Sequence, residues 1–348
     1  MSNLQIGLAI AGGVILAAVV AHGAWSSRRN APRQAKPEPS AGQASQTQLR
    51  EPVLDGDIAQ DTQPMSLPPV ARRSAMDSLI DVIATIALDG ANPVVSGEAA
   101  IAAMPSTRRA GTKPFAIEGY NLTTLNWEVP TAGHRYGGFQ AGVQLANRSG
   151  ALNEIEYSEF VVKTQAFADA INATPEFPEM LEEVARAREL DQFASAHDAQ
   201  LGFTIRARDA SWSPGYVQQN AAHLGFVAGV IPGRMVLPAS TEGLAPLLVL
   251  SFDPQAALAE DPAQSAIRDI ALHLDVAQVD RNEQPFDRMR EVAAELAHTM
   301  DGVVTDDNGQ LLTAATMDGI GVELQSLYDT LEQRDLAAGS LLARRLFA

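Results

Sequence analysis

The side chains of this 348-residue chain with the clearest capacity for chemistry are two adjacent carboxylates near its C-terminal end. Asp306 and Asp307 precede Asn308-Gly309, and paired carboxylates of this kind could serve acid–base catalysis or calcium binding. Adjacent Asp residues before Asn-Gly are nevertheless typical of turns, because their side chains cap the backbone and tolerate left-handed conformations. We therefore interpret this motif as a turn.

Other catalytic and metal-binding patterns are missing from the sequence. The chain has no cysteine, which excludes disulfides, thiolate catalysis and zinc–thiolate sites. No two histidines stand at His-x-x-x-His or His-x-His spacing, and Ala110-Gly111-Thr112-Lys113 predicts a basic turn because it lacks the phosphate-loop pattern. No Gly-x-Ser-x-Gly elbow occurs. We expect a non-enzymatic protein without cofactor or metal. Its histidines are His22, His134, His197, His223, His273 and His298.

Charge divides the chain into two parts. Residues 1–75 carry seven basic and five acidic residues, whereas residues 76–348 carry 18 basic and 37 acidic residues. A folded region with this excess of carboxylates is poorly suited to nucleic acid or to an anionic lipid surface. We expect its partner to be a protein or peptide, and no nucleic acid.

The N-terminal segment has the composition of a membrane anchor. An apolar run from Leu4 to Ala24 is followed by Trp25 and then by Arg28 and Arg29. As a helix the run would reach about 30 Å, the thickness of a bilayer's hydrocarbon core. A secretory signal peptide would carry positive charge before the run, and Met1-Ser2-Asn3 is uncharged. By the positive-inside rule the N-terminus is then periplasmic and the rest of the chain cytoplasmic, in the inner membrane.

The same segment leaves two alternatives open. Ala21-His22-Gly23 is compatible with signal-peptide cleavage. Small residues also recur every fourth position, the spacing that lets two membrane helices approach closely, so self-association through the anchor is a hypothesis beside plain contact with lipid. These small residues are Ala9, Gly13, Ala17 and Ala21.

The rest of the chain is expected to hold a linker and two modules. Asn30 to Ala75 is rich in Pro, Gln and Ser and lacks apolar periodicity, which predicts a disordered tether. The remainder exceeds what one compact core commonly holds. The predicted boundaries are an anchor at 1–29, a linker at 30–75, modules at 76–198 and 199–336, and a C-terminal tail at 337–348.

Hydrophobic periodicity predicts an α+β fold for both modules, with antiparallel sheets and helices packed on one face. In the second module we expect strands at 202–208, 226–237, 247–252 and 267–276, helices at 213–223 and 286–300, a hairpin at 303–312 and a helix at 317–331. In the first we expect strands at 80–88, 115–129 and 136–147 and helices at 96–104, 154–172 and 178–194.

The order of elements in the first module echoes that in the second. Phe177-Pro178-Glu179-Met180 is placed as the counterpart of Phe286-Asp287-Arg288-Met289 at the start of a long helix. The echo indicates a degenerate duplication of a split β-α-β-like module, in which strand 201–208 could serve both sheets. A single larger irregular domain is the alternative.

Several stretches together resemble the ZipA cell division protein family. His22-Gly23-Ala24-Trp25-Ser26-Ser27-Arg28-Arg29 is similar to the end of that family's anchor, and anchor, Pro/Gln-rich linker and C-terminal domain occur in the family's order. Residues 78–195 have no counterpart in the short form of the family, apart from Gln144-Leu145-Ala146-Asn147, which resembles its third strand. The similar C-terminal stretches are Leu224-Gly225-Phe226, Pro246 to Phe252, Phe286-x-x-Met289, Met300 to Asp307 and Leu311-Leu312-Thr313.

The resemblance implies an inner-membrane adaptor that tethers FtsZ filaments to the cytoplasmic membrane during septum formation. The solvent face of its C-terminal sheet would form a shallow groove for the C-terminal tail of FtsZ. This lining is more polar than the family's usual Met and Phe, and His273 stands where an aromatic residue is expected. The groove residues carried over by position are Thr204, Arg206, Met235, Val249, Ser251, Ala271 and His273.

Two other classes of function remain open from the sequence. An anchored periplasmic sensor or binding domain would need the opposite orientation in the membrane. An anchored hydrolase would need a site assembled from residues that are scattered along the chain. The acidic, cysteine-free composition and the family resemblance favour the adaptor.

Overall fold

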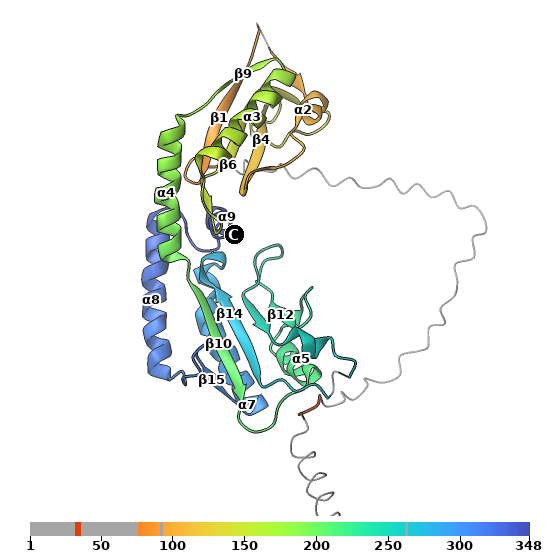
Figure 1. Ribbon diagram of the computed structural model, residues 1–348, viewed down its shortest axis with the longest axis vertical. Coiled ribbons are helices and arrows are strands. Elements are labelled where there is room, and N and C mark those ends of the chain that lie inside the picture. Colours follow the sequence, from red (N-terminus) through yellow and green to blue (C-terminus); the bar gives the residue numbers. More distant parts are fainter. Residues whose placement is uncertain (1–31, 36–75, 91–92, 262–263) are drawn as a thin grey trace, which may run out of the picture. The chain divides into compact units, whose positions relative to one another are not determined.

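The computed structural model describes residues 32–35, 76–90, 93–261 and 264–348, which divide into two units (Figure 1). The N-terminal unit comprises residues 76–90 and 93–196 together with Ala348, and the C-terminal unit comprises residues 32–35 together with the described residues from His197 to Phe347. Helices and antiparallel sheets alternate in both units, as the sequence predicts for an α+β protein.

The N-terminal unit is built on one antiparallel sheet in the order β3-β4-β6-β1-β9. Short strands β2 and β5 pair with β6 and β4, and β7 and β8 form a separate hairpin. The strands are β1 (Asp81–Leu88), β2 (Val95–Ser96), β3 (Arg109–Ala110), β4 (Lys113–Asn121), β5 (Trp127–Glu128), β6 (Arg135–Gln144), β7 (Ala146–Asn147), β8 (Gly150–Ala151) and β9 (Ala173–Glu176). The helices are α2 (Gly97–Ala103), α3 (Glu154–Ala170) and α4 (Met180–His197).

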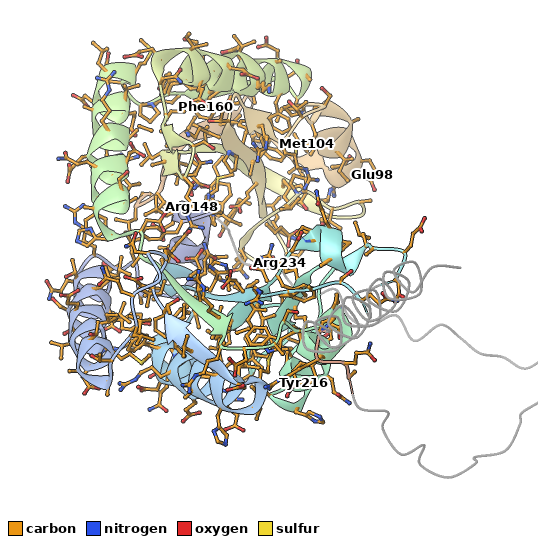
Figure 2. The ribbon with its side chains drawn as sticks, turned by 60° about the horizontal axis from the view of Figure 1, so that its bottom comes forward. Glu98, Met104, Arg148, Phe160, Tyr216 and Arg234 are labelled. Carbon is orange, nitrogen blue, oxygen red and sulfur yellow. The ribbon has the colours of Figure 1, made fainter. Side chains whose placement is uncertain are left out.

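Aromatic side chains hold α3 against this sheet. Phe160 of α3, labelled in Figure 2, is fully buried, and its ring centroid lies 6.0 Å from that of Phe115 on β4 and 5.9 Å from that of Phe177. The helix begins at a capping box in which Asn153 accepts from the Glu156 amide and Glu156 accepts from the Asn153 amide. Local capping and aromatic burial therefore both fix α3 on the sheet.

The C-terminal unit contains a six-stranded antiparallel sheet in the order β11-β12-β13-β14-β10-β15. Its strands are β10 (Gln200–Ala207), β11 (Val227–Ala228), β12 (Arg234–Leu237), β13 (Leu248–Ser251), β14 (Asp269–Asp275) and β15 (Gly302–Thr305). Its helices are α5 (Pro214–His223), α6 (Pro254–Ala257), α7 (Pro285–Met300), α8 (Ala314–Gln333) and α9 (Leu341–Leu346), with 3₁₀ turns at Val276–Gln278 and Arg281–Glu283.

One row of apolar residues crosses the centre of this sheet and forms the core with α7. Met235, Leu250, Leu272 and Phe203 are paired in register on neighbouring strands, and each is at most 5% exposed. The ring centroids of Phe203 and Phe286 of α7 lie 6.2 Å apart. Directly paired residues share one face of a sheet, so α7 covers the face that carries this row.

Both units share one order of paired elements. In each, a central strand (β1 or β10) lies between a strand from later in the chain (β6 or β14) and an edge strand (β9 or β15). Helix α3 precedes β9 just as α7 precedes β15, and α4 and α8 follow those edge strands. This common topology agrees with the echo in the sequence, and descent by duplication stays a prediction.

Several sequence expectations need correction. The sequence does not predict strand β9, because Ala173-Thr174-Pro175-Glu176 is short and contains proline. Since Phe177–Met180 comes after this edge strand and not before it, the counterpart of α7 is α3 rather than α4. Strand β10 pairs only with β14 and β15 and is not shared between sheets. The expected strands at 115–129, 136–147 and 226–237 each break into two.

Glycine explains the break between β11 and β12. Gly233 has a φ of +76°, and a Cβ there would lie 2.6 Å from the Phe252 carbonyl oxygen, so the chain turns tightly against β13. Past Thr305 the expected hairpin shrinks to one bridge between Thr305 and Leu311. The expected tail contains helix α9, whose Ala343 and Leu346 are buried.

In the part of the chain that the structure describes, no helix is both long and apolar enough to span a bilayer. The predicted anchor at 4–24 and the linker residues 30–31 and 36–75 lie outside the described residues. Residues 32–35 are described, and Arg33 forms a parallel bridge with Trp212. This short part of the predicted tether therefore has fixed contacts.

Replacing Leu272 by Asp should unfold the C-terminal unit, because an unpaired carboxylate would be buried at a fully enclosed position between Phe203 and Leu250. We expect a loss of more than about 3 kcal/mol in the free energy of unfolding. Urea denaturation followed by circular dichroism measures it. His273→Asp, one residue further along the same strand and exposed, is the matched control; equal stability of the two variants would contradict the assigned facing.

Candidate functional site

The face of the C-terminal sheet opposite α7 is formed by the residues that alternate with the buried row. Val236, Val249, His273 and Gly202 pair across β12, β13, β14 and β10. A second row runs beside it, through Arg234, Ser251, Ala271 and Thr204, and ends at Thr305, which is buried; Arg206 and Asp269 pair in the next row. We call this surface the open face, because His273, Arg206 and Arg234 on it are exposed.

Six of the seven residues predicted to line a groove lie on the open face. Arg206 and His273 are exposed, and Thr204, Val249, Ser251 and Ala271 are half-buried. For these six residues the structure confirms the predicted direction of the side chains. Their part in binding stays a proposal. The reason for the agreement is that β10, β13 and β14 alternate regularly between apolar and more polar residues.

Met235 is wrongly placed by the sequence prediction. It is 5% exposed and pairs with Leu250, so it belongs to the buried row under the sheet. Its neighbours Arg234 and Val236 occupy the open face instead, and Arg234 is labelled in Figure 2. The error arises because β12 is only four residues long and its first three, Arg-Met-Val, include two apolar side chains on opposite faces.

The polar groups of the open face are linked by short contacts. Ser251 Oγ lies 3.2 Å from His273 Nε2, on the adjacent strand. Arg206 Nε donates to Asp269 Oδ1 at 2.7 Å, forming an ion pair whose side chains are both about half exposed to solvent. The pair is therefore screened by water and contributes little to stability. The Arg206 guanidinium and the Asp269 carboxylate together offer a bound partner hydrogen-bond donors and an acceptor side by side.

A hollow of about 640 Å³ opens next to these residues. Val249, Ser251 and His273 line it together with Gly202, Arg234 and Asp307. Gly202 lies at its floor, where a Cβ would come within 3.3 Å of Asp307 Oδ1 and 3.7 Å of His273 Nδ1, so the hollow depends on a residue without a side chain there. A pocket of this size with apolar and polar walls can receive the side chains of a bound peptide.

Sequence reasoning missed Gly202, Arg234, Val236 and Asp307 as parts of this surface. Asp306 does form the predicted turn, because its Oδ1 accepts from the amides of Asn308 and Gln310 at 2.9 and 2.7 Å. The turn brings the Asp307 carboxylate over Gly202 on β10, about a hundred residues earlier in the chain. No local signal in the sequence reports such a contact between distant segments.

One cluster in the N-terminal unit resembles a catalytic arrangement. Glu128 Oε1 lies 2.6 Å from His134 Nδ1 and accepts from Asn121 Nδ2 at 2.7 Å and from the Tyr136 hydroxyl at 2.9 Å. His134 Nδ1 also lies 3.1 Å from Asn121 Nδ2, so the ring is held by an amide and a carboxylate. The Tyr136 hydroxyl accepts from the Thr131 amide at 2.8 Å, which fixes the loop between β5 and β6.

Hydrogen bonding controls the charge of this cluster. Burial alone raises the pKa of Glu128, but the hydrogen bonds from Asn121, His134 and Tyr136 outweigh it, and the pKa lies below its ordinary value of 4.5. Burial and the bond to Glu128 raise the pKa of Tyr136 despite the Thr131 amide. The cluster therefore holds an ionised carboxylate at a site that is only 7% exposed.

The predicted turn at Ala110–Lys113 connects β3 and β4, and the Lys113 side chain at its end is buried. Its Nζ donates to Asn147 Oδ1 at 2.8 Å and to the Gly150 carbonyl at 2.6 Å, which fastens the β7–β8 hairpin to β4. Burial lowers the pKa of Lys113, with Glu156 acting in the opposite direction. In the described segments no three His, Cys, Asp or Glu side chains come together as metal ligands.

Tyr136→Phe should destabilise the N-terminal unit at neutral pH by about 1–3 kcal/mol, because Glu128 loses a donor and the Thr131 amide loses its acceptor. Since the lowered pKa of Glu128 stabilises the fold above about pH 4.5, that contribution disappears as the pH falls through the lowered value. The difference in the free energy of unfolding between wild type and variant should therefore become smaller at acid pH. Thermal unfolding at pH 7 and at about pH 3 tests this; a gap that is independent of pH would contradict it.

Comparison with known protein families gives a match in the C-terminal unit. Residues 252–321 match the family described as ZipA, C-terminal FtsZ-binding domain. The match includes β14, α7 and β15, and so contains Ala271 and His273 of the open face but not Val249 or Thr204. No curated protein matches the chain.

Among solved structures, berberine bridge enzyme from Eschscholzia californica aligns with 77% of this chain at 9% identity and a TM-score of 0.16, values that support no statement about fold or function. The chain spans 54% of the length of that structure's chain. The match of residues 252–321 remains as the finding that bears on identity. It confirms the resemblance found in the sequence: residues 252–321 of the C-terminal unit are similar to the family described as ZipA, C-terminal FtsZ-binding domain.

Proposed function

We propose that the C-terminal unit binds the C-terminal tail of FtsZ on its open face and that the protein acts as an adaptor in bacterial cell division. The observation that carries the proposal is the family match over residues 252–321, which contributes β14 at the middle of a sheet face that α7 leaves uncovered. FtsZ binding is the property named in that family's description.

The chemistry of the open face suits an extended peptide of mixed character. Val236, Val249 and Ala271 give an apolar strip, and the hollow beside Gly202 can take a larger side chain. Arg234 and Asp307 place opposite charges on the walls of that hollow, so a bound tail could be oriented by its own charges. Few large apolar side chains are present, and we therefore expect modest affinity for each tail.

Weak binding of each tail is enough to hold a polymer at a surface. Many copies of a tail on one filament can engage many adaptors, so avidity rises without stronger individual contacts. We propose that the segment 4–24 supplies the surface by spanning the inner membrane, with the folded units in the cytoplasm. Self-association through that segment would add to the same effect.

Filling the hollow or charging the apolar strip should weaken tail binding without unfolding the unit. Gly202→Leu places a side chain in the hollow; its φ needs no glycine, and the Asp307 side chain, 3.3 Å from the new Cβ, has to shift by a few tenths of an ångström. Val249→Asp and His273→Asp introduce a carboxylate that a bound tail would have to desolvate, at about 1–3 kcal/mol of binding free energy each. Fluorescence anisotropy with a labelled FtsZ-tail peptide measures the loss.

Val322→Asp is the matched control, because Val322 lies on α8, is 72% exposed and receives the same new charge away from the open face. It should bind like the wild type. If the three open-face variants melt normally and also bind like the wild type, the open face is not the binding surface, and the N-terminal unit becomes the leading candidate.

Deleting Leu4–Ala24 should move the protein to the soluble fraction and abolish its accumulation at mid-cell while leaving tail binding in solution unchanged. The physical reason is that only this apolar segment is long enough to be held by the bilayer. Cell fractionation and fluorescence microscopy are the measurements. Continued membrane association of the truncated protein, or activity of a periplasmic reporter fused to the C-terminus, would contradict the proposed anchoring.

A further inference from the structure

The short segment 32–35, from the predicted linker, lies against the C-terminal unit next to α5 (Figure 1). Its backbone extends a small ladder: the Arg33 amide donates to the Ser211 carbonyl at 2.7 Å, and the Ser213 amide donates to the Arg33 carbonyl at 2.9 Å. On its other side Trp212 exchanges two backbone hydrogen bonds of 2.8 Å with Ile267. Arg33 therefore pairs with the side of the Ser211–Ser213 segment that faces away from Ile267.

The side chain of Arg33 reaches the end of α7. Its Nη1 donates to the Met300 carbonyl at 3.1 Å, and its Nη2 donates to Asp301 Oδ2 at 2.7 Å. The last carbonyls of a helix lack partners within the helix, and a positive charge there also interacts favourably with the helix dipole. Trp212 Nε1 donates to the same Met300 carbonyl at 2.8 Å.

The receiving surface is a built site rather than a flexible loop. Ser211, Trp212 and Ser213 are 5%, 0% and 2% exposed, and Ser213 also caps α5 by accepting from the Tyr216 amide. Asp301 has a φ of +57° as the C-cap of α7, and its amide donates to the Ala297 carbonyl, so the backbone that carries its carboxylate is held in place. Figure 2 labels Tyr216 on α5, whose hydroxyl donates to the Thr299 carbonyl at 3.2 Å. Helices α5 and α7 thus fix both halves of the site.

We infer that the edge at Ser211–Ser213 together with Asp301 is a docking site for the chain's own residues 32–35, and that this contact is a latch between the N-terminal segment and the C-terminal unit. Only eight residues separate Ala24 from Arg33, which span at most about 30 Å when extended. A free linker of residues 30–75 would allow several times that reach.

The latch changes what the linker connects. With Arg33 docked, the C-terminal unit is attached to the chain only a few residues after the proposed anchor. Residues 36–75 then connect the two units, rather than connecting a membrane segment to a folded domain. If the proposed anchor is correct, the open face is held within a few nanometres of the bilayer. The docking itself does not depend on the anchor or on FtsZ binding.

A disulfide test can detect the docked state directly. A Cβ at Gly215 would lie 3.8 Å from the Cβ of Ala35, which is the usual separation in a disulfide. The chain contains no native cysteine, so Ala35→Cys with Gly215→Cys introduces the only two thiols. The full chain in detergent is treated with a mild oxidant, and non-reducing electrophoresis and mass spectrometry follow the intramolecular bond.

We expect rapid intramolecular oxidation, and slowing by about tenfold or more when Arg33→Glu is added, because that change removes a charge-assisted hydrogen bond and sets two carboxylates against each other. Ala35→Cys with Ser326→Cys on the exposed surface of α8 is the control pair, since α8 and residues 32–35 are well separated in Figure 1. Thermal unfolding of the Arg33→Glu variant checks that the unit remains folded.

Three results would overturn the latch. Oxidation of the test pair no faster than that of the control pair would mean that residues 32–35 are not docked. An unchanged rate with Arg33→Glu in a folded protein would remove the role of the Met300 and Asp301 contacts. A disulfide-linked dimer would assign the site to residues 32–35 of a second copy. None of these readouts involves FtsZ, so failure here leaves the proposed function untouched.

Discussion

The two-residue period of the β-strand is the constraint on which the C-terminal unit depends. Once Phe203, Leu250 and Leu272 are packed under α7, the residues next to them in each strand must point the other way. Core and candidate site are thus two faces of one set of strands. A change that shifted the register by one residue would exchange the faces and destroy both together.

The same period explains which parts of the site could be predicted from the sequence. Strands β10 and β14 alternate over seven or eight residues, and their facing was correctly inferred for Thr204, Arg206, Ala271 and His273. Strand β12 has four residues, and its facing depends on pairing with β13 rather than on its own pattern, so Met235 was misplaced. The position of Asp307 above Gly202 depends on two segments that meet only after folding.

The N-terminal unit shows how one topology can be specialised. Its sheet has the same order of central and edge strands, yet its middle strand β6 carries glycines where β14 carries larger residues. Buried polar groups also hold it together: Glu128 with Tyr136, and Lys113 with Asn147. Such networks favour a single arrangement when all partners are satisfied, because any other arrangement leaves a charge unpaired. The family match, over residues 252–321, lies outside this unit.

The docking of Arg33 differs in kind from binding at the open face, because the ligand and the site belong to one chain. A connected ligand is present at an effective concentration that is fixed by the connection, of millimolar order at most for a flexible one. Four residues can then remain docked although the same tetrapeptide, free in solution, would bind too weakly to matter. Occupancy at Trp212 and Asp301 is therefore independent of how much protein the cell makes, whereas occupancy of the open face depends on the supply of its partner.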